Sequence, residues 1–188
     1  MAQKQNRSRY AILGILSYGP MSGYDIQKFF ADIAGFWQES YGQIYPNLNQ
    51  LLQEGLVNKQ IEQRDKGPNR HQYTLTHAGE QVLQTWLQEM AEPLPHRNEL
   101  LLKLIFSYQA GHAAAQQQLL AYKNHLNEEI GNLNIIEAWQ EAQLDEGDPH
   151  ALYRRMAVRY GLHTHRALLT WCDECLAELE KVEKPENS

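Results

Sequence analysis

The segment 40–55 predicts an α-helix with an almost uncharged surface, and this feature limits the fold more than any other. Ser40 and Gln43 have the spacing of a capping box, and Gly55 supplies a stop signal. One face of the predicted helix is apolar, formed by Ile44, Leu48, Leu51 and Leu52. The opposite face is small or amide-bearing: Gly42, Gln43, Pro46, Asn49, Gln50 and Gln53, with Asn47 at its border and Tyr41 nearby. Amides can pair with base edges in a DNA groove, although idle surface helices also carry them.

A basic β-hairpin is predicted directly after this helix. Residues 56–63 and 70–76 alternate between apolar and polar side chains, and the Lys-Gly-Pro-Asn sequence between them is typical of a turn. Arg64, Lys66 and Arg70 lie at or near the tip. Such cations can bind phosphates, which position a protein on a duplex without reading its sequence. The alternative is a solvated turn with no partner.

Two further helices are predicted before this pair of elements. Ser8 is expected to cap the first, which stops at Gly19-Pro20, and Ser22 with Asp25 to open the second. A fourth helix is expected after a cap at Thr76. Helix, helix, amide-faced helix and basic hairpin together predict a winged helix-turn-helix, whose third helix enters the major groove.

The distribution of charge also separates the chain into two parts. The formal net charge is −6, which argues against a general binder of polyanions. Residues 1–70, however, carry eight basic and six acidic residues, whereas residues 93–188 carry nine and fourteen. We therefore expect a DNA-binding domain over residues 1–92 and, after the boundary marked by Pro93 and Pro95, a different domain over residues 93–188.

The second domain is predicted to consist of long helices that form a dimer. Apolar residues recur at helical spacing on both sides of a break at Gly147-Asp148-Pro149. The residues expected to pack against a second subunit are Leu119, Tyr122, Leu126, Leu162, Leu169 and Leu176. Packing within one chain is the alternative. The fold class is thus mainly α with a small β-hairpin.

Other functional classes receive little support. Cys172 and Cys175 are the only cysteines, and they can be structural, a redox sensor or part of a metal site, although a metal would need two more ligands. No metal and no cofactor is expected. No nucleophile–base pair, glycine-rich phosphate loop or zinc motif is present, so an enzyme is not expected. The longest apolar run is too short to cross a bilayer, and nothing resembles a secretory signal or a disulfide framework, so the prediction is a cytoplasmic protein.

The order of several motifs resembles the PadR family of bacterial transcription regulators. These motifs are residues 10–16 (YAILGIL), 22–26 (SGYDI), 42–48 (GQIYPNL), 54–57 (EGLV) and 73–79 (YTLTHAG). The remainder is similar to the longer C-terminal region of a subgroup, the virulence-activator alpha domain. The resemblance implies a homodimer on a two-fold-symmetric operator, usually as a repressor and in some members as an activator, and in the broader family a response to small aromatic molecules.

The predicted function is therefore a dimeric, sequence-specific DNA-binding regulator that acts as a repressor, and whether it responds to an effector is left open. Residues expected to face bases or the groove walls are Tyr41, Gln43, Asn47, Asn49 and Gln50. Phosphates are assigned to Arg7, Arg9, Arg64, Lys66 and Arg70. Phe36, Trp37 and Tyr108 are candidates for an aromatic pocket, with plain core as the alternative. A winged helix that docks on proteins without binding DNA is the competing function. The sequence leaves open the operator, the effector and the role of the cysteines.

Overall fold

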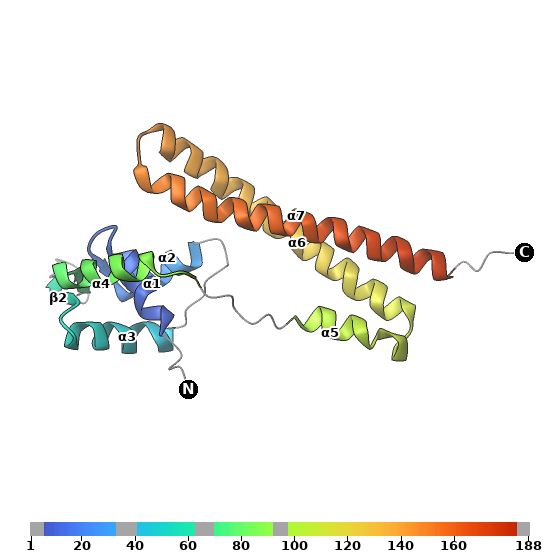
Figure 1. The fold of residues 1–188 in the computed structure, drawn as a ribbon, viewed down its shortest axis with the longest axis horizontal. Coiled ribbons are helices and arrows are strands. Elements are labelled where there is room, and N and C mark those ends of the chain that lie inside the picture. Colours follow the sequence, from blue (N-terminus) through green and yellow to red (C-terminus); the bar gives the residue numbers. More distant parts are fainter. Residues whose placement is uncertain (1–5, 33–40, 63–69, 92–97, 184–188) are drawn as a thin grey trace, which may run out of the picture. The chain divides into compact units, whose positions relative to one another are not determined.

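A computed structural model describes residues 6–32, 41–62, 70–91 and 98–183. The chain divides into two compact units, Met1–Pro93 and Leu94–Ser188. Short helices and a small sheet form the first unit, whereas two long helices dominate the second (Figure 1).

The first unit has the predicted winged-helix elements. Its helices are α1 (Arg7–Leu16), α2 (Gly23–Asp32), α3 (Tyr41–Gln53) and α4 (His77–Gln88). The two predicted hairpin strands are present as β2 (Val57–Glu62) and β3 (Arg70–Leu75), antiparallel and with Val57 opposite Leu75. A third strand, β1 (Met21–Ser22), pairs with the other edge of β3, so the order is β1-β3-β2. β1 could not be predicted from the sequence, because two residues are too few to show alternation.

Most of the predicted helix boundaries are confirmed. Ser22 and Asp25 form a capping box, in which the Ser22 amide donates to the Asp25 carboxylate and the Asp25 amide donates to the Ser22 hydroxyl. The Thr76 hydroxyl accepts from the amide of Gly79, as expected of a cap. The cap predicted at Ser8 is wrong, because α1 begins at Arg7. Ser40 lies outside the described residues.

One hydrophobic core joins the elements of the first unit. Its fully buried side chains include Ile12, Leu13, Ile26, Ile44, Leu48 and Leu51 from the first three helices. The sheet contributes Val57 and Tyr73 to this core, and α4 contributes Leu83. The ring of Trp86 in α4 stacks on that of Tyr10 in α1, with centroids 4.8 Å apart. The apolar side of α3 is therefore fixed inward, which presents its other side to solvent.

The second unit is built on a pair of antiparallel helices. The short α5 (Glu99–Ile105), capped by Asn98, and a 3₁₀ turn η1 (Ser107–Gln109) lead into α6 (His112–Asp145). A tight turn at Gly147 (φ +90°) then leads to α7 (Pro149–Glu183). Pro149 occupies the first position of α7, where proline is well tolerated. In the described part of the chain, no helix has the combination of length and apolarity needed to span a membrane.

Three of the six residues assigned to dimer contacts are instead covered within the single chain. Leu119, Leu126 and Leu162 are at most 2% exposed within the single chain. Leu119 and Leu126 form a cluster with Cys172, and Tyr122, Leu169 and Leu176 pack against it. Leu119, Leu126 and Leu162 are thus covered within one chain, which is the intrachain alternative considered above. Tyr122, Leu169 and Leu176 are only half-buried, and their contact with a second subunit stays a prediction. The long stripes did not reveal their partner because an antiparallel helix of the same chain buries them as well as a second subunit would.

Candidate nucleic-acid interface

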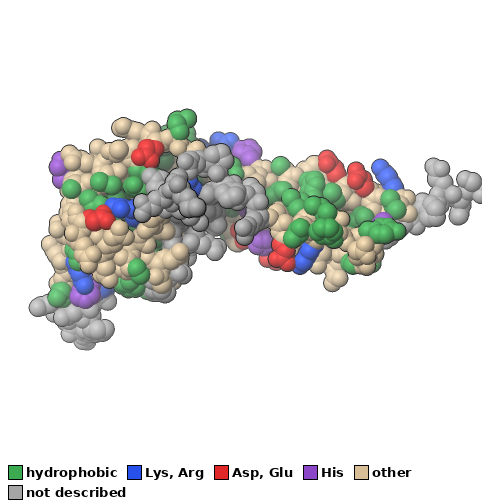
Figure 2. Space-filling model, turned by 60° about the horizontal axis from the view of Figure 1, so that its bottom comes forward, with side chains coloured by type: hydrophobic (Ala, Val, Ile, Leu, Met, Phe, Trp, Pro, Cys, Tyr) green, Lys and Arg blue, Asp and Glu red, His purple; other side chains and the backbone are tan. Residues whose placement is uncertain are grey.

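The polar side of α3 is exposed as the sequence predicts. Gly42, Gln43, Asn49, Gln50 and Gln53 are all exposed, whereas Ile44, Leu48 and Leu51 on the other side are fully buried. Figure 2 shows the first unit from the side on which α3 lies, and most of that surface is neither acidic nor basic. A helix with an uncharged, hydrogen-bonding surface can approach base edges at a low cost of desolvation.

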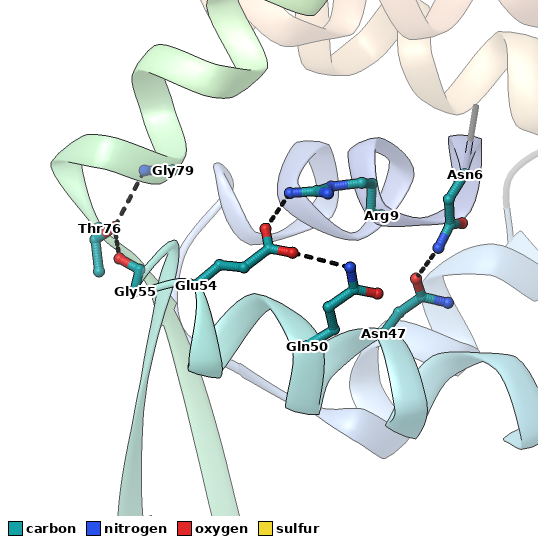
Figure 3. Close-up of polar contacts among 8 residues, drawn as sticks. All are labelled: Asn6, Arg9, Asn47, Gln50, Glu54, Gly55, Thr76 and Gly79. Atoms are coloured by element: carbon teal, nitrogen blue, oxygen red, sulfur yellow. Dashed lines mark hydrogen bonds and ion pairs between the residues drawn. The ribbon is translucent and has the colours of Figure 1, made fainter. Parts of the chain in front are cut away.

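A chain of polar contacts links the end of α3 to α1. The Gln50 amide Nε2 donates to Glu54 Oε1 at 2.8 Å, and the guanidinium of Arg9 pairs with Glu54 Oε2 (Figure 3). The Arg9 and Glu54 side chains are 21% and 35% exposed, so the pair lies at the edge of the surface rather than in the core. Arg9 was predicted to bind phosphate, but in the structure its charge faces a carboxylate.

Asn47 does not face outward, and its predicted role is corrected. Its side chain is only 9% exposed. Its Nδ2 donates to the Gln43 carbonyl oxygen and its Oδ1 accepts from Asn6 Nδ2, each at 2.7 Å. Asn47 therefore connects α3 to the residue before α1. The helical wheel put this residue at the border of the polar face, and the neighbouring helix covers that border.

The predicted phosphate-binding cations fall into three groups. Arg64 and Lys66 lie outside the described residues. Arg70 pairs with Asp25, with Nη2 2.6 Å from Oδ1, which joins β3 to the start of α2. Arg7 is the first residue of α1, at the amino end of the unit. Tyr41 begins α3, and its side chain also lies outside what the structure describes.

Asp25 is the best-defined electrostatic feature of the first unit. Burial acts to raise the pKa of its carboxyl, but hydrogen bonds from Ser22 and Arg70 and the charge of Arg70 outweigh it, so the pKa lies below the usual carboxyl value. The carboxylate thus caps α2 and also holds the first residue of β3. The Asp25 side chain is thus one of the links between the helix-turn-helix and the wing.

The other end of the wing is fixed by close backbone contact. The Thr76 hydroxyl donates to the Gly55 carbonyl oxygen at 2.8 Å and accepts from the Gly79 amide at 3.1 Å (Figure 3). A Cβ atom on Gly79 would lie 2.2 Å from the Leu56 carbonyl oxygen. Glycine is therefore required where α4 crosses the start of β2. A second glycine, Gly23, gives similar room to the ring of Tyr45.

The candidates for an aromatic pocket are only partly described. Phe36 and Trp37 lie outside the described residues. Tyr108 is 90% exposed and borders a cavity of about 360 Å³ between η1 and the adjoining ends of α6 and α7. Cys175, Glu178 and Leu179 form part of its wall.

The two cysteines have the environment of structural thiols. Cys172 is fully buried between α6 and α7, and Cys175 is half-buried. Burial raises the pKa of both thiols, and the neighbouring Glu178 and Glu174 raise that of Cys175 further. Thiols of this kind are mostly protonated at neutral pH and are poor nucleophiles.

Glu54 and Asn6 belong to this surface but were not among the residues predicted for it. Glu54 is four residues after Gln50, a spacing at which helical side chains meet, and it is the one charged residue of the predicted helix. That spacing was a usable signal. Asn6 gave none, because its contact with Asn47 joins residues 41 positions apart.

Two family models match the chain. Residues 12–85 match the transcriptional regulator PadR-like family, and residues 96–180 match the virulence activator alpha C-terminal family. The negative transcriptional regulator PadR of Bacillus subtilis (strain 168) is 28% identical over 181 residues, covering 92% of this chain and 97% of that protein.

Solved structures give the same relationship. B. subtilis PadR in complex with operator DNA matches with a TM-score of 0.81 and 26% identity, over 93% of this chain and 99% of that chain. The same protein in complex with p-coumaric acid matches with a TM-score of 0.73 and 26% identity, over 92% and 98%. The Vibrio cholerae virulence activator AphA matches with a TM-score of 0.72 and 29% identity, over 93% and 98%.

Proposed function

The chain belongs to the PadR-like transcriptional regulators, and from this premise we propose that it is a homodimeric, cytoplasmic repressor that reads operator DNA with α3. It is a DNA-binding regulator and not an enzyme. The observation that carries the proposal for α3 is its uncharged, exposed amide surface, held outward by a buried apolar side.

We assign base contacts and phosphate contacts to different residues. Gln43, Asn49 and Gln50 face bases, while Arg64 and Lys66 between β2 and β3 bind phosphates. An amide that pairs with a base edge contributes about 1–3 kcal/mol of discrimination, whereas a phosphate contact adds affinity for every sequence alike. Asn47 is left out of the reading set because its amide joins α3 to Asn6.

The test is a gel-shift titration on the DNA upstream of the protein's own gene, with an unrelated duplex alongside. We expect tight binding to the upstream duplex and two chains per site at saturation. Lys66→Ala should weaken binding to both duplexes and reduce the salt slope by about one unit. Unchanged affinity of this variant for every duplex at low salt would contradict the assignment of the wing. A folded protein that binds neither duplex at any salt would favour the protein-docking function.

A homodimer is supported by apolar side chains that the single chain leaves exposed. On α5 and at its end these include Ile105 and Phe106, 72% and 63% exposed, and on α7 they include Met156 and Tyr160. Figure 2 shows hydrophobic side chains gathered on the second unit in the region of α5. Exposed apolar patches of this kind mark interaction surfaces. Sedimentation equilibrium should give twice the chain mass of 21.8 kDa.

Variants of these patches distinguish a specific dimer from general association. Phe106→Lys or Met156→Lys should shift the protein toward the monomer, whereas Gln109→Lys, at an exposed polar position of η1, should not. A monomer in the wild type at micromolar concentration would refute the homodimer.

We further propose that a small aromatic molecule releases the DNA by binding in the cavity beside Tyr108. The cavity, about 360 Å³, has the size of a small-ligand site and is mainly apolar. Glu178 lies in the wall of the cavity. Its carboxylate would repel the carboxylate of an aromatic acid, so the cavity favours a neutral or cationic aromatic ring. Aromatic compounds should release the wild type from DNA but not Leu179→Trp, in which the larger ring occupies the cavity. Equal release of both proteins would exclude this cavity as the site.

A further inference from the structure

The side-chain amide of Gln50 is held in one of its two possible orientations. An amide presents an acceptor on one side and donors on the other, and a rotation of 180° exchanges them. Only the NH₂ end can donate to a carboxylate, and Gln50 Nε2 lies 2.8 Å from Glu54 Oε1. Figure 3 shows the Gln50 oxygen directed away from Glu54.

From this contact we infer that Glu54, held in place by Arg9, orients the amide of Gln50 so that it reads adenine. One N–H of Gln50 is used by Glu54, so the second N–H and Oε1 remain as an adjacent donor and acceptor. Adenine presents the complementary pair in the major groove, the N7 acceptor and the N6 donor. Guanine presents two acceptors, N7 and O6, on the same edge. An amide fixed in this orientation would place its own acceptor oxygen against guanine O6, and the two would repel.

Arg9 has a separate part in this arrangement. A carboxylate near DNA repels phosphates, and the Arg9 guanidinium pairs with Glu54 Oε2 while Gln50 contacts Oε1. The pair therefore keeps the charge of the site balanced and fixes the carboxylate from the side of α1. Glu54 and Arg9 are positioning residues, and Gln50 is the reader. This inference rests on the proposed role of α3 in the major groove.

The experiment begins with selection of bound sequences from a pool of randomised duplexes by the wild type and by Gln50→Ala. The base pair at which Gln50→Ala loses its preference identifies the contact, and we expect adenine there. Affinities are then measured for matched duplexes with adenine or guanine at that position. Wild type should prefer adenine by about tenfold or more.

Glu54→Gln is the variant that tests the positioning role. A glutamine at position 54 can either accept from Gln50 or donate to it, so the Gln50 amide can turn. The preference for adenine should fall to the level of Gln50→Ala, and the double variant should lose nothing more. The matched control is Glu62→Gln, because Glu62 on β2 also accepts from a glutamine amide, Gln72 Nε2 at 3.1 Å, and the change in charge is the same.

The outcomes are distinct. A change in affinity that is equal for adenine and guanine, in both Glu54→Gln and the control, would show a charge effect only and overturn the inference. A Gln50-dependent preference for guanine, or none at any position, would also overturn it. Wild type that binds no duplex would instead refute the proposed function. In a second measurement, a duplex with purine lacking the N6 amino group should bind wild type as weakly as Gln50→Ala binds adenine.

Discussion

Replacing Gly79 with alanine is expected to destabilise the first unit strongly. Gly79 lies in the first turn of α4, where its Cβ would be placed 2.2 Å from the Leu56 carbonyl oxygen and 2.8 Å from Leu75 Cδ1. Carbon–oxygen contacts are ordinarily about 3.3 Å or longer, so the helix and the start of β2 must separate by about 1 Å. The Leu56 oxygen also accepts from the Thr76 amide at 3.1 Å, and separation strains that bond.

The expected magnitude follows from three contributions. Overpacking against backbone costs up to about 3 kcal/mol, and weakening the bond to Thr76 costs about 1 kcal/mol. Alanine regains at most about 1 kcal/mol through its higher helix propensity. The free energy of unfolding of the first unit should therefore fall by about 2–3 kcal/mol. For a unit of this size that lowers the melting temperature by roughly 10–20 °C.

Gly14→Ala is the matched control, because Gly14 lies inside α1 of the same unit and an added Cβ would meet nothing within 4 Å. This variant should be stabilised, by up to about 1 kcal/mol. Scanning calorimetry gives the melting temperatures, and hydrogen exchange read by mass spectrometry assigns each change to its unit. A Gly79→Ala protein that melts as high as Gly14→Ala would refute the argument from close approach.

Three further predictions concern charge, packing and thiols. Asp25→Asn should lower the free energy of unfolding, measured in urea, by its largest amount near pH 7 and by less as the pH falls below about 4. The reason is that a carboxyl with a lowered pKa stabilises the fold only while it is ionised. A difference independent of pH would exclude the ion pair with Arg70 as its source. Leu126→Ala should cost the second unit about 2–5 kcal/mol in the same assay, whereas Leu120→Ala, at a position 46% exposed, should cost much less. Cys172 should resist a maleimide reagent in the folded protein and react on unfolding, because burial covers the thiol and raises its pKa. Fast labelling of the folded protein at neutral pH would contradict this burial.

Local chemistry explains why some elements could be predicted from sequence and others could not. The capping residues Ser22, Thr76 and Asn98 act on amides within three positions of themselves, so the sequence alone indicates where their helices begin. The side of α3 that faces the core is also set locally, by the spacing of its apolar residues along the helix. The partners of Asn47 and of the α6 stripe depend on segments distant in the sequence, and periodicity shows that a face is covered without showing what covers it.

The candidate site follows the same division. The exposure of Gln43, Asn49 and Gln50 could be predicted from the helical period. The pairing of Arg9 and Arg70 with carboxylates could not, because each pair joins residues 45 positions apart. A count of basic residues therefore overestimates the cations available for phosphates when the acids that face them are far away in the chain.

The spacing of the leucines between α6 and α7 limits how this protein can change in length. Leu119, Leu126 and Leu133 recur every seven residues on α6, and Leu162, Leu169 and Leu176 do so on α7. A seven-residue repeat added to both helices preserves their contact and lengthens the pair by about 10.5 Å. Insertions of three or four residues change the local winding and rotate the leucines away from one another. Evolution can therefore adjust the reach of this helical pair in steps of one whole heptad, while intermediate lengths require a new core.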